Sequence, residues 1–409
     1  MPTGIFNTGS FATDLAKPSF SNMITRLMPN GSAPLFGLTS MLSDETAQAV
    51  EHGFFSKTMI FPELKINLSA GYNAGATTFV TDSTANVLPG MIMRIERTGE
   101  NVIINSITDA TDVVVTRSVG TVAAAAILNN DDLYQVGTAF EEASVRPSAN
   151  NIIPVRVTNL TQIFRNTWAI SGSANSTEVI AGDSTEAETR HDCAAFHATN
   201  IESAIFFGQK SQGTRNGQPF RTMDGLINMI ETPANYPASY GGATNSSTAG
   251  STTNWTQILG YLDPVFDQTT DPKGARERLL FVGGAAKLVI NEIARLNGQT
   301  NLMEGQTTFG MEFTTLITPR GKFRVVEHPL FNTNATWGKM AVAVDLPTFR
   351  LAYLKGRKTS NKEFNTSGNQ AADNGIDAVG GTLTTECTTV IKNTPANAII
   401  RNLTAAALG

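Results

Sequence analysis

Residues 73–138 contain five short runs of aliphatic and β-branched residues, each bounded by turn-forming residues. The runs are residues 77–80, 91–97, 101–107, 112–119 and 133–136. Between the second and third runs, the sequence RTGE (97–100) predicts a tight hairpin, because glycine adopts positive φ without steric cost. Five strands in so short a segment predict a small sandwich or barrel.

The segments on either side of this β module predict how it joins the rest of the chain. Residues 59–66 and 139–143 are interpreted as two arms of one long excursion that carries the module. A module of this kind can be inserted into a host loop, because its two ends can lie close together.

A long helix is predicted from residue 183 to residue 208. Asp183 and Glu186 have the spacing of a capping box, and Gly208 is a suitable stop. At 100° per residue one narrow stripe is expected to pack on a sheet. The stripe consists of Ala187, Ala194, Ala198, Ile201 and Ile205.

The remaining elements indicate the α+β class, because helices and strands are segregated rather than strictly alternating. Helices are expected at 255–266 and 285–297, with a buried strand at 279–282 between them. Long strands are expected at 350–364 and 382–391. The first 50 residues lack sustained periodicity, which predicts either a disordered tail or an arm that orders on a partner.

Charged residues make up only 16% of the chain, against about 25% in ordinary soluble domains. Neutral polar surface is easier to bury against a neighbour, because little charge is desolvated. A β-rich protein with many turns explains the composition equally well. The formal net charge of -5 gives no footprint for general nucleic-acid binding.

Neither export nor membrane insertion is expected. The N-terminus lacks a basic start followed by an apolar run, and no stretch reaches 18 consecutive apolar residues. A disulfide between Cys193 and Cys387 is not expected in a chain without export signals.

The sequence HDCAAFH (191–197) concentrates residue types that bind transition metals. On a helix, Cys193 and His197 share a face, whereas His191 points elsewhere. Three ligands therefore cannot converge on one ion from this helix alone. We expect packed polar and small residues here rather than a metal site, with a metal-dependent enzyme as the alternative.

The strand–glycine–helix passage LLFVGG (279–284) has neither dinucleotide-binding nor P-loop glycine spacing, and Lys287 falls inside the helix. The pair Glu141–Glu142 lacks a second acidic motif to complete an acid/base site. It is interpreted as a solvated or inter-subunit charge. No catalytic residue, cofactor or metal ligand is therefore assigned.

One basic run occurs near the C-terminal strands, at Lys355, Arg357, Lys358 and Lys362. A solvated strand explains it. The alternatives are ion pairs with acidic residues of a neighbouring subunit, or contact with packaged nucleic acid.

The order of these parts resembles the major capsid protein of tailed phages, the Hong Kong 97 fold, in the group whose extended loop carries a β module. The resemblance covers essentially the whole chain. It rests on NLTQIFRNTWAISGS from Asn159, TFGMEF from Thr308, TPRGKFRVVEHP from Thr318, GGTLTTE from Gly380, KNTPANAIIRNL from Lys392, RTGE from Arg97 and VTRSVGT from Val115.

The resemblance implies a domain plan. Residues 1–50 would be the N-terminal arm, and residues 51–150 the E-loop with its β insertion at about 73–138. Residues 151–221 and 346–409 would form the P-domain, with 183–208 as its spine helix and 346–409 as its closing strands. Residues 222–345 would form the A-domain.

The resemblance also implies an icosahedral shell of hexamers and pentamers around double-stranded DNA, bound without sequence specificity. The expected partners are further copies of the chain, portal and scaffolding proteins, and a decoration protein. No membrane partner is expected. The protein would assemble in the host cytoplasm and reside in the virion capsid. A tail or fibre component is the alternative.

Charged residues on the excursion and in the basic run are the candidates for contacts between subunits. They are Glu63, Lys65, Glu141, Glu142, Arg146, Lys355, Arg357 and Lys358.

Overall fold

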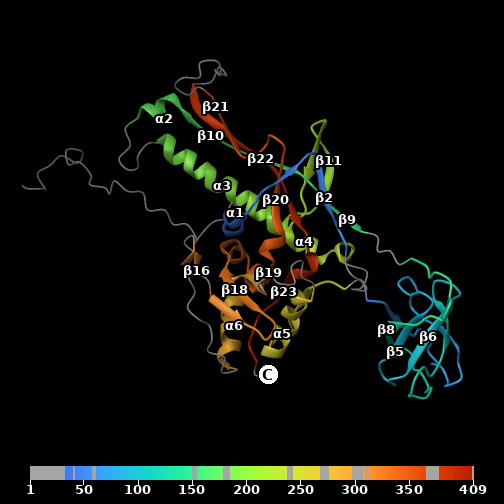
Figure 1. Ribbon diagram of the computed structural model, residues 1–409. Helices are drawn as coiled ribbons and strands as arrows, with labels where there is room; N and C mark the ends of the chain where they lie inside the picture. Colours follow the sequence, from blue (N-terminus) through green and yellow to red (C-terminus); the bar gives the residue numbers. More distant parts are fainter. Residues whose placement is uncertain are drawn as a thin grey trace, which may run out of the picture. The chain divides into compact units, whose positions relative to one another are not determined.

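The computed structural model divides the chain into two compact units (Figure 1). The body comprises residues 1–54 and 156–409, and the β unit comprises residues 55–155. The structure describes residues 33–39, 42–57, 61–149, 154–177, 185–236, 243–267, 276–296, 307–308, 311–312, 314–364 and 377–407.

The β unit is a barrel of six strands in the order β3-β8-β5-β6-β7-β4. An antiparallel bridge between Ile66 and Thr81 joins the ends of the two outermost strands, which closes the sheet on itself. The strands are β3 (Glu63–Lys65), β4 (Thr78–Val80), β5 (Met91–Ile95), β6 (Asn101–Ile107), β7 (Asp112–Thr116) and β8 (Asp132–Thr138).

The five predicted runs are confirmed as β4 to β8, and Gly99 has the predicted positive φ of 72°. The structure corrects the predicted boundary of the module. The segment around β3 was expected in an arm, but β3 is a barrel strand paired with β8. The reason is alternation: Leu64 and Ile66 fill the barrel interior, whereas Glu63 and Lys65 face outward.

The body contains a five-stranded sheet in the order β1-β20-β22-β10, with β21 also paired to β22. The strand β22 (Ala378–Ile391) organises this sheet, because it pairs antiparallel with three others. These three are β10 (Gln162–Ser171), β20 (Phe349–Leu354) and β21 (Ser360–Phe364), and β1 (Glu45–Ala47) completes the sheet by pairing with β20. The predicted strand 350–364 is therefore two strands, separated by a turn in which Gly356 has a φ of 75°.

A single long helix, α3 (Thr185–Phe207), lies along β10 and β22 (Figure 1). The helix confirms the prediction, although Asp183 of the predicted capping box lies outside the described residues. The predicted alanine stripe is wrong in its first half, because Ala187 and Ala194 are exposed. Cys193 and His197 lie on the buried face instead, each one position before the predicted Ala194 and Ala198. Ile201 and Ile205 are buried as predicted.

The rest of the body is an α/β lobe with a six-stranded sheet in the order β13-β23-β19-β14-β18-β17. Its strands are β13 (Ser246–Thr248), β14 (Glu277–Val282), β17 (Thr314–Ile317), β18 (Lys322–Glu327), β19 (Ala341–Val344) and β23 (Ala398–Arg401). The helices α5 (Trp255–Leu262) and α6 (Gly284–Leu296) confirm two predictions. The structure corrects a third, because β23 was expected among the closing strands of the other sheet and pairs with β19 here.

Shorter elements complete the body. They are α1 (Pro34–Thr39), α2 (Gly172–Ser176), α4 (Leu226–Glu231), the pairs β2 (Glu51–Ser56) with β9 (Val155–Leu160), β11 (Ser211–Arg215) with β12 (Gln218–Thr222), and β15 (Thr307–Thr308) with β16 (Met311–Glu312). One buried apolar cluster joins the long sheet to the α/β lobe, through residues such as Phe164, Ile205 and Phe281. Among the described residues no helix is both long and apolar enough to cross a membrane.

The packing of β22 against its neighbouring strands can be tested at Gly380. A Cβ at Gly380 would lie 2.4 Å from the Trp168 carbonyl oxygen and 2.6 Å from Cζ of Phe364. We predict that Gly380→Ala lowers the stability of the body by about 1–3 kcal/mol, because overpacking forces its neighbours apart. Urea unfolding of the unassembled subunit, followed by tryptophan fluorescence, measures this change.

The control is Gly260→Ala in α5, where a Cβ meets nothing within 4 Å. This substitution should stabilise by about 0.5–1 kcal/mol, because alanine favours a helix interior over glycine. Equal effects of the two substitutions would contradict the packing argument.

Candidate functional site

The histidines of HDCAAFH have different environments. His191 is exposed, whereas His197 is buried between α3 and the long sheet. The Nδ1 atom of His197 lies 2.8 Å from Oδ1 of Asn166, and its Nε2 atom lies 2.8 Å from Oγ1 of Thr385. Burial lowers the pKa of His197, which favours a neutral ring that donates from Nδ1 and accepts at Nε2.

His197 therefore connects α3, β10 and β22 through buried hydrogen bonds rather than binding a metal. We call such a buried polar group that connects separate elements a joint. The described residues contain no group of three His, Cys, Asp or Glu side chains arranged to bind a metal. Burial also raises the pKa of the Cys193 thiol, which keeps it protonated.

A second joint lies five residues further along α3, at the fully buried carboxylate of Glu202. Its Oε1 accepts from the Leu35 amide at 2.9 Å, and its Oε2 accepts from the Phe36 amide at 2.6 Å. These amides are at the second and third positions of α1, where a helix has no internal acceptors. Glu202 thus caps a helix 167 residues away in sequence.

The same carboxylate reaches the α/β lobe. The Nε2 atom of His328 lies 2.7 Å from Oε1 of Glu202, and its Nδ1 atom accepts from the Leu330 amide at 3.2 Å. The imidazole is enclosed by the rings of Phe206 and Phe331, with centroids 4.7 Å and 4.8 Å away. One buried carboxylate therefore joins α1, α3 and the segment after β18.

A third joint is the buried carboxylate of Glu386 on β22. It accepts from Oγ1 of Thr161 at 2.9 Å, and it pairs with Nε of Arg357 at 2.5 Å and with Nη2 of Arg221 at 3.5 Å. Arg357 belongs to the basic run that was assigned to contacts between subunits. An intrachain ion pair accounts for its charge.

Amides make a fourth joint. The Nδ2 atom of Asn159 donates to the carbonyl oxygens of Asp224 and Thr389, each at 3.0 Å, and its Oδ1 accepts from the Asp224 amide at 2.7 Å. These bonds tie the start of the α4 region to β22. The sequence motifs that carried the resemblance contain Asn159, Asn166, His328 and Glu386, so these motifs encode the buried polar joints of the body.

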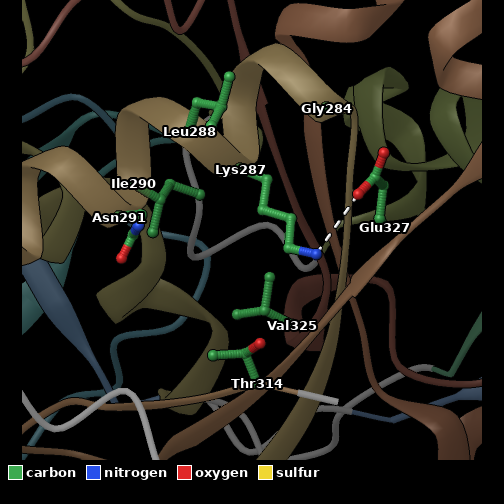
Figure 2. Close-up of a pocket in the computed structure, with 8 residues that line it drawn as sticks. All are labelled: Gly284, Lys287, Leu288, Ile290, Asn291, Thr314, Val325 and Glu327. Carbon is green, nitrogen blue, oxygen red and sulfur yellow. Dashed lines mark hydrogen bonds and ion pairs between the residues drawn. The ribbon is translucent and has the colours of Figure 1, made fainter. Parts of the chain in front are cut away.

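The glycine turn before α6 was compared with nucleotide-binding turns in the sequence analysis. Its polar groups make contacts within the chain. The Gly284 amide donates to Oδ1 of Asn332 at 2.7 Å. Lys287 reaches Glu327 on β18, with 3.3 Å between Nζ and Oε2 (Figure 2). Figure 2 shows this pair beside a pocket between α6 and the sheet. The Gly284 amide and the Lys287 amine are thus both engaged by partners within the chain.

The charged residues assigned to subunit contacts are exposed, and the structure separates them into two groups. Lys358 forms an ion pair with Asp44, in addition to the Arg357–Glu386 pair. All eight stay predictions of contacts between subunits, and the other six have no ion pair with another described residue. They are Glu63, Lys65, Glu141, Glu142, Arg146 and Lys355.

The β unit has a buried ion pair between Glu100, in the motif RTGE, and Arg117, in the motif VTRSVGT. Glu100 is fully buried and forms two hydrogen bonds with Arg117, at 2.7 Å and 2.6 Å. The amides of Ser118 and Ala125 also donate to it. Burial by itself raises the pKa of Glu100, but Arg117 and the two amides outweigh burial and lower it.

Sequence reasoning missed Glu202, Glu386 and Asn159. One signal for Glu202 was available in the sequence. Helical periodicity places it on the buried face of α3, and a buried carboxylate needs partners. The partners themselves lie more than 100 residues away and leave no local pattern.

We predict that Glu202→Gln frees α1. The amide group presents a donor where the carboxylate accepted from three groups, so about 1.5–3 kcal/mol of local stability is lost. Hydrogen exchange of residues 33–39, read by mass spectrometry, should accelerate at least about tenfold. The control Glu186→Gln, in the first turn of α3, should leave that exchange unchanged.

We predict that Arg117→Met destabilises the β unit by about 3–5 kcal/mol, because the buried Glu100 carboxylate loses its countercharge. In the unsubstituted protein the Glu100 contribution is fully present above its unfolded pKa of about 4.3 and is lost as pH falls through the lower folded pKa. Hydrogen exchange of residues 112–127 measures the loss at neutral pH. Arg94→Met, on the exposed face of β5, serves as the control.

Comparison with known proteins gives one result over nearly the whole chain. The family model described as SU10 major capsid protein matches residues 3–404. The major capsid protein of Pseudomonas phage PaMx41 is 36% identical over 408 residues, which cover 98% of this chain and 96% of that protein.

Solved structures from two phages are similar to this chain. The capsid of the myovirus XM1 matches with a TM-score of 0.46 and 8% identity, covering 98% of this chain and 100% of the other. Mycobacterium phage Cain matches with a TM-score of 0.46 and 9% identity over 99% of both chains. The family match and the 36% identity together establish that the chain belongs to the SU10 family of major capsid proteins.

Proposed function

We propose that the chain assembles with further copies of itself, as hexamers and pentamers, into an icosahedral shell that encloses the double-stranded DNA of a tailed phage. The match of the full chain to a family of major capsid proteins carries this proposal. The shell forms in the host cytoplasm with portal and scaffolding proteins, and the role is structural rather than enzymatic. A decoration protein is a further proposed partner.

Exposed apolar side chains on both sides of the barrel strands support assembly. Phe55 is 70% exposed, Phe61 78% and Val145 88%, all on segments before β3 and after β8. Burying one such side chain contributes about 1.5–3 kcal/mol. We propose that neighbouring copies in a shell cover these side chains, which the described part of a single chain leaves exposed, and that many weak contacts then act together.

Charged residues on the same segments fit the rim of such an interface. Glu141, Glu142 and Arg146 are exposed close to Val145, and Glu63 and Lys65 lie on the outer face of β3. Charges at a rim contribute to specificity and association rate more than to affinity. Within the basic run, Lys355 has no ion pair with a described residue, and we propose that it meets a neighbour.

The charge balance bears on the packaged DNA. A net charge of -5 disfavours tight binding to phosphates. The shell is therefore proposed to bind the DNA phosphates weakly, and we propose no sequence specificity for the DNA that it encloses.

We predict that the purified protein, with its scaffolding protein where needed, forms closed shells visible by electron microscopy. The variant Phe61→Asp with Val145→Asp should stay unassembled, because two charges replace apolar contacts. The control Asn86→Asp adds a charge at an exposed loop of the β unit and should assemble normally.

Circular dichroism should show that all three proteins are folded. Tubes or fibres in place of shells would indicate a tail or fibre component. Unimpaired shells from the double variant would contradict the role of these side chains.

A further inference from the structure

The short strand β1 lies in the sequence between two elements that are held more firmly. Before it, α1 is capped by the buried carboxylate of Glu202. After it, β2 pairs with β9, and the Val50 carbonyl oxygen accepts from the Thr161 amide at 2.8 Å. The segment that carries β1 is therefore attached to the body at both of its ends.

Backbone and apolar contacts hold β1 itself only weakly. It has 3 residues and pairs in parallel with β20, and the Ala47 carbonyl oxygen accepts from the Lys355 amide at 3.0 Å. Of its side chains, Ala47 alone is buried, in a small cluster with Ala352 and Val390. An alanine side chain removes little apolar area from water, so this contact contributes little to the attachment.

Ion pairs supply the rest of the attachment. Asp44 pairs with Lys358, and the side chain of this lysine is 67% exposed. Glu45 pairs with Lys392, which is 48% exposed, and its Oε2 atom lies 3.4 Å from Nε2 of His52. Partly exposed ion pairs weaken with salt, because salt shortens the range of electrostatic attraction from about 10 Å at 0.1 M to about 3 Å at 1 M.

We propose that residues 44–47 form a strap that opens and closes on β20 in the unassembled subunit, and that the ion pairs to Lys358 and Lys392 fasten it. Salt opens the strap, whereas α1 and β2 stay attached. Opening uncovers backbone groups along the edge of β20. An uncovered strand edge is a template for pairing, so the strap controls when this edge is available. The inference goes beyond the proposed function and does not require a shell, because every contact lies within one chain.

Hydrogen exchange of the full-length, unassembled subunit at rising salt concentration tests the strap. Between about 0.1 M and about 1 M sodium chloride, the amides of residues 44–47 should exchange at least about threefold faster, because screening weakens the ion pairs. The amides of α1 and of residues 51–54 should keep their exchange rates. Unchanged protection of β14, in the other sheet of the body, shows that the protein remains folded at each salt concentration.

Lysine variants show whether the two named cations fasten the strap. Lys358→Met with Lys392→Met should raise the exchange rate of residues 44–47 at low salt to that of the unsubstituted protein at high salt, and it should remove the response to salt. Lys355→Met is the matched control, because Lys355 lies in the same basic run, is exposed and has no ion pair with a described residue. This control should keep the full response to salt.

Three outcomes would each overturn the proposal. The first is an exchange rate of residues 44–47 in the unsubstituted protein that does not respond to salt. The second is a joint acceleration of α1 and residues 44–47, which would show that the whole segment opens as one piece. The third is an equal effect of Lys355→Met and the double variant. Because the test uses unassembled protein, its failure is separate from a failure to form shells.

Discussion

A fully buried carboxylate on the long helix α3, Glu202, holds together parts of the chain that lie far apart in sequence. A six-residue helix such as α1 is not stable by itself, because few hydrogen bonds offset the cost of nucleation. Glu202 supplies the two acceptors that the first turn of α1 lacks, and it binds His328 of the α/β lobe with the same group. Removal of this carboxylate therefore affects three elements at once. A buried charge is costly unless every lone pair finds a donor, and here three donors converge on it.

The other joints of the body follow the same principle with different chemistry. His197 is held as a neutral ring between Asn166 and Thr385, and Asn159 satisfies backbone groups of two segments. Buried hydrogen bonds of this kind specify one arrangement of α3 on the sheet, because a shift by one residue leaves several groups unpaired. The contrast between a closed body and exposed apolar segments suits a shell subunit. The body is closed by buried polar joints, whereas the segments before β3 and after β8 keep apolar side chains exposed, where we propose that neighbouring copies cover them.

Much of the fold was predictable from local patterns. The strands β4 to β8, the helices α3, α5 and α6, and the strand β14 have periodicity or turn chemistry that acts over a few residues. The errors share one cause. The faces of α3, the membership of β3 in the barrel and the membership of β23 in the lobe sheet are decided by partners remote in sequence. Of the candidate contact residues, Arg357 and Lys358 are paired within the chain, and no local signal distinguishes their partners Glu386 and Asp44 from other acidic residues.

The sequence by itself determined the α+β class, the inserted β module and the long helix, because these depend on spacing along one element. Only the tertiary structure decided that Cys193 and His197 face the sheet, that Glu202 caps a distant helix, and that the motif residues form the buried joints of the body. The physical reason is that a buried polar group is stable only with its partners, and those partners come together only when the whole chain has folded.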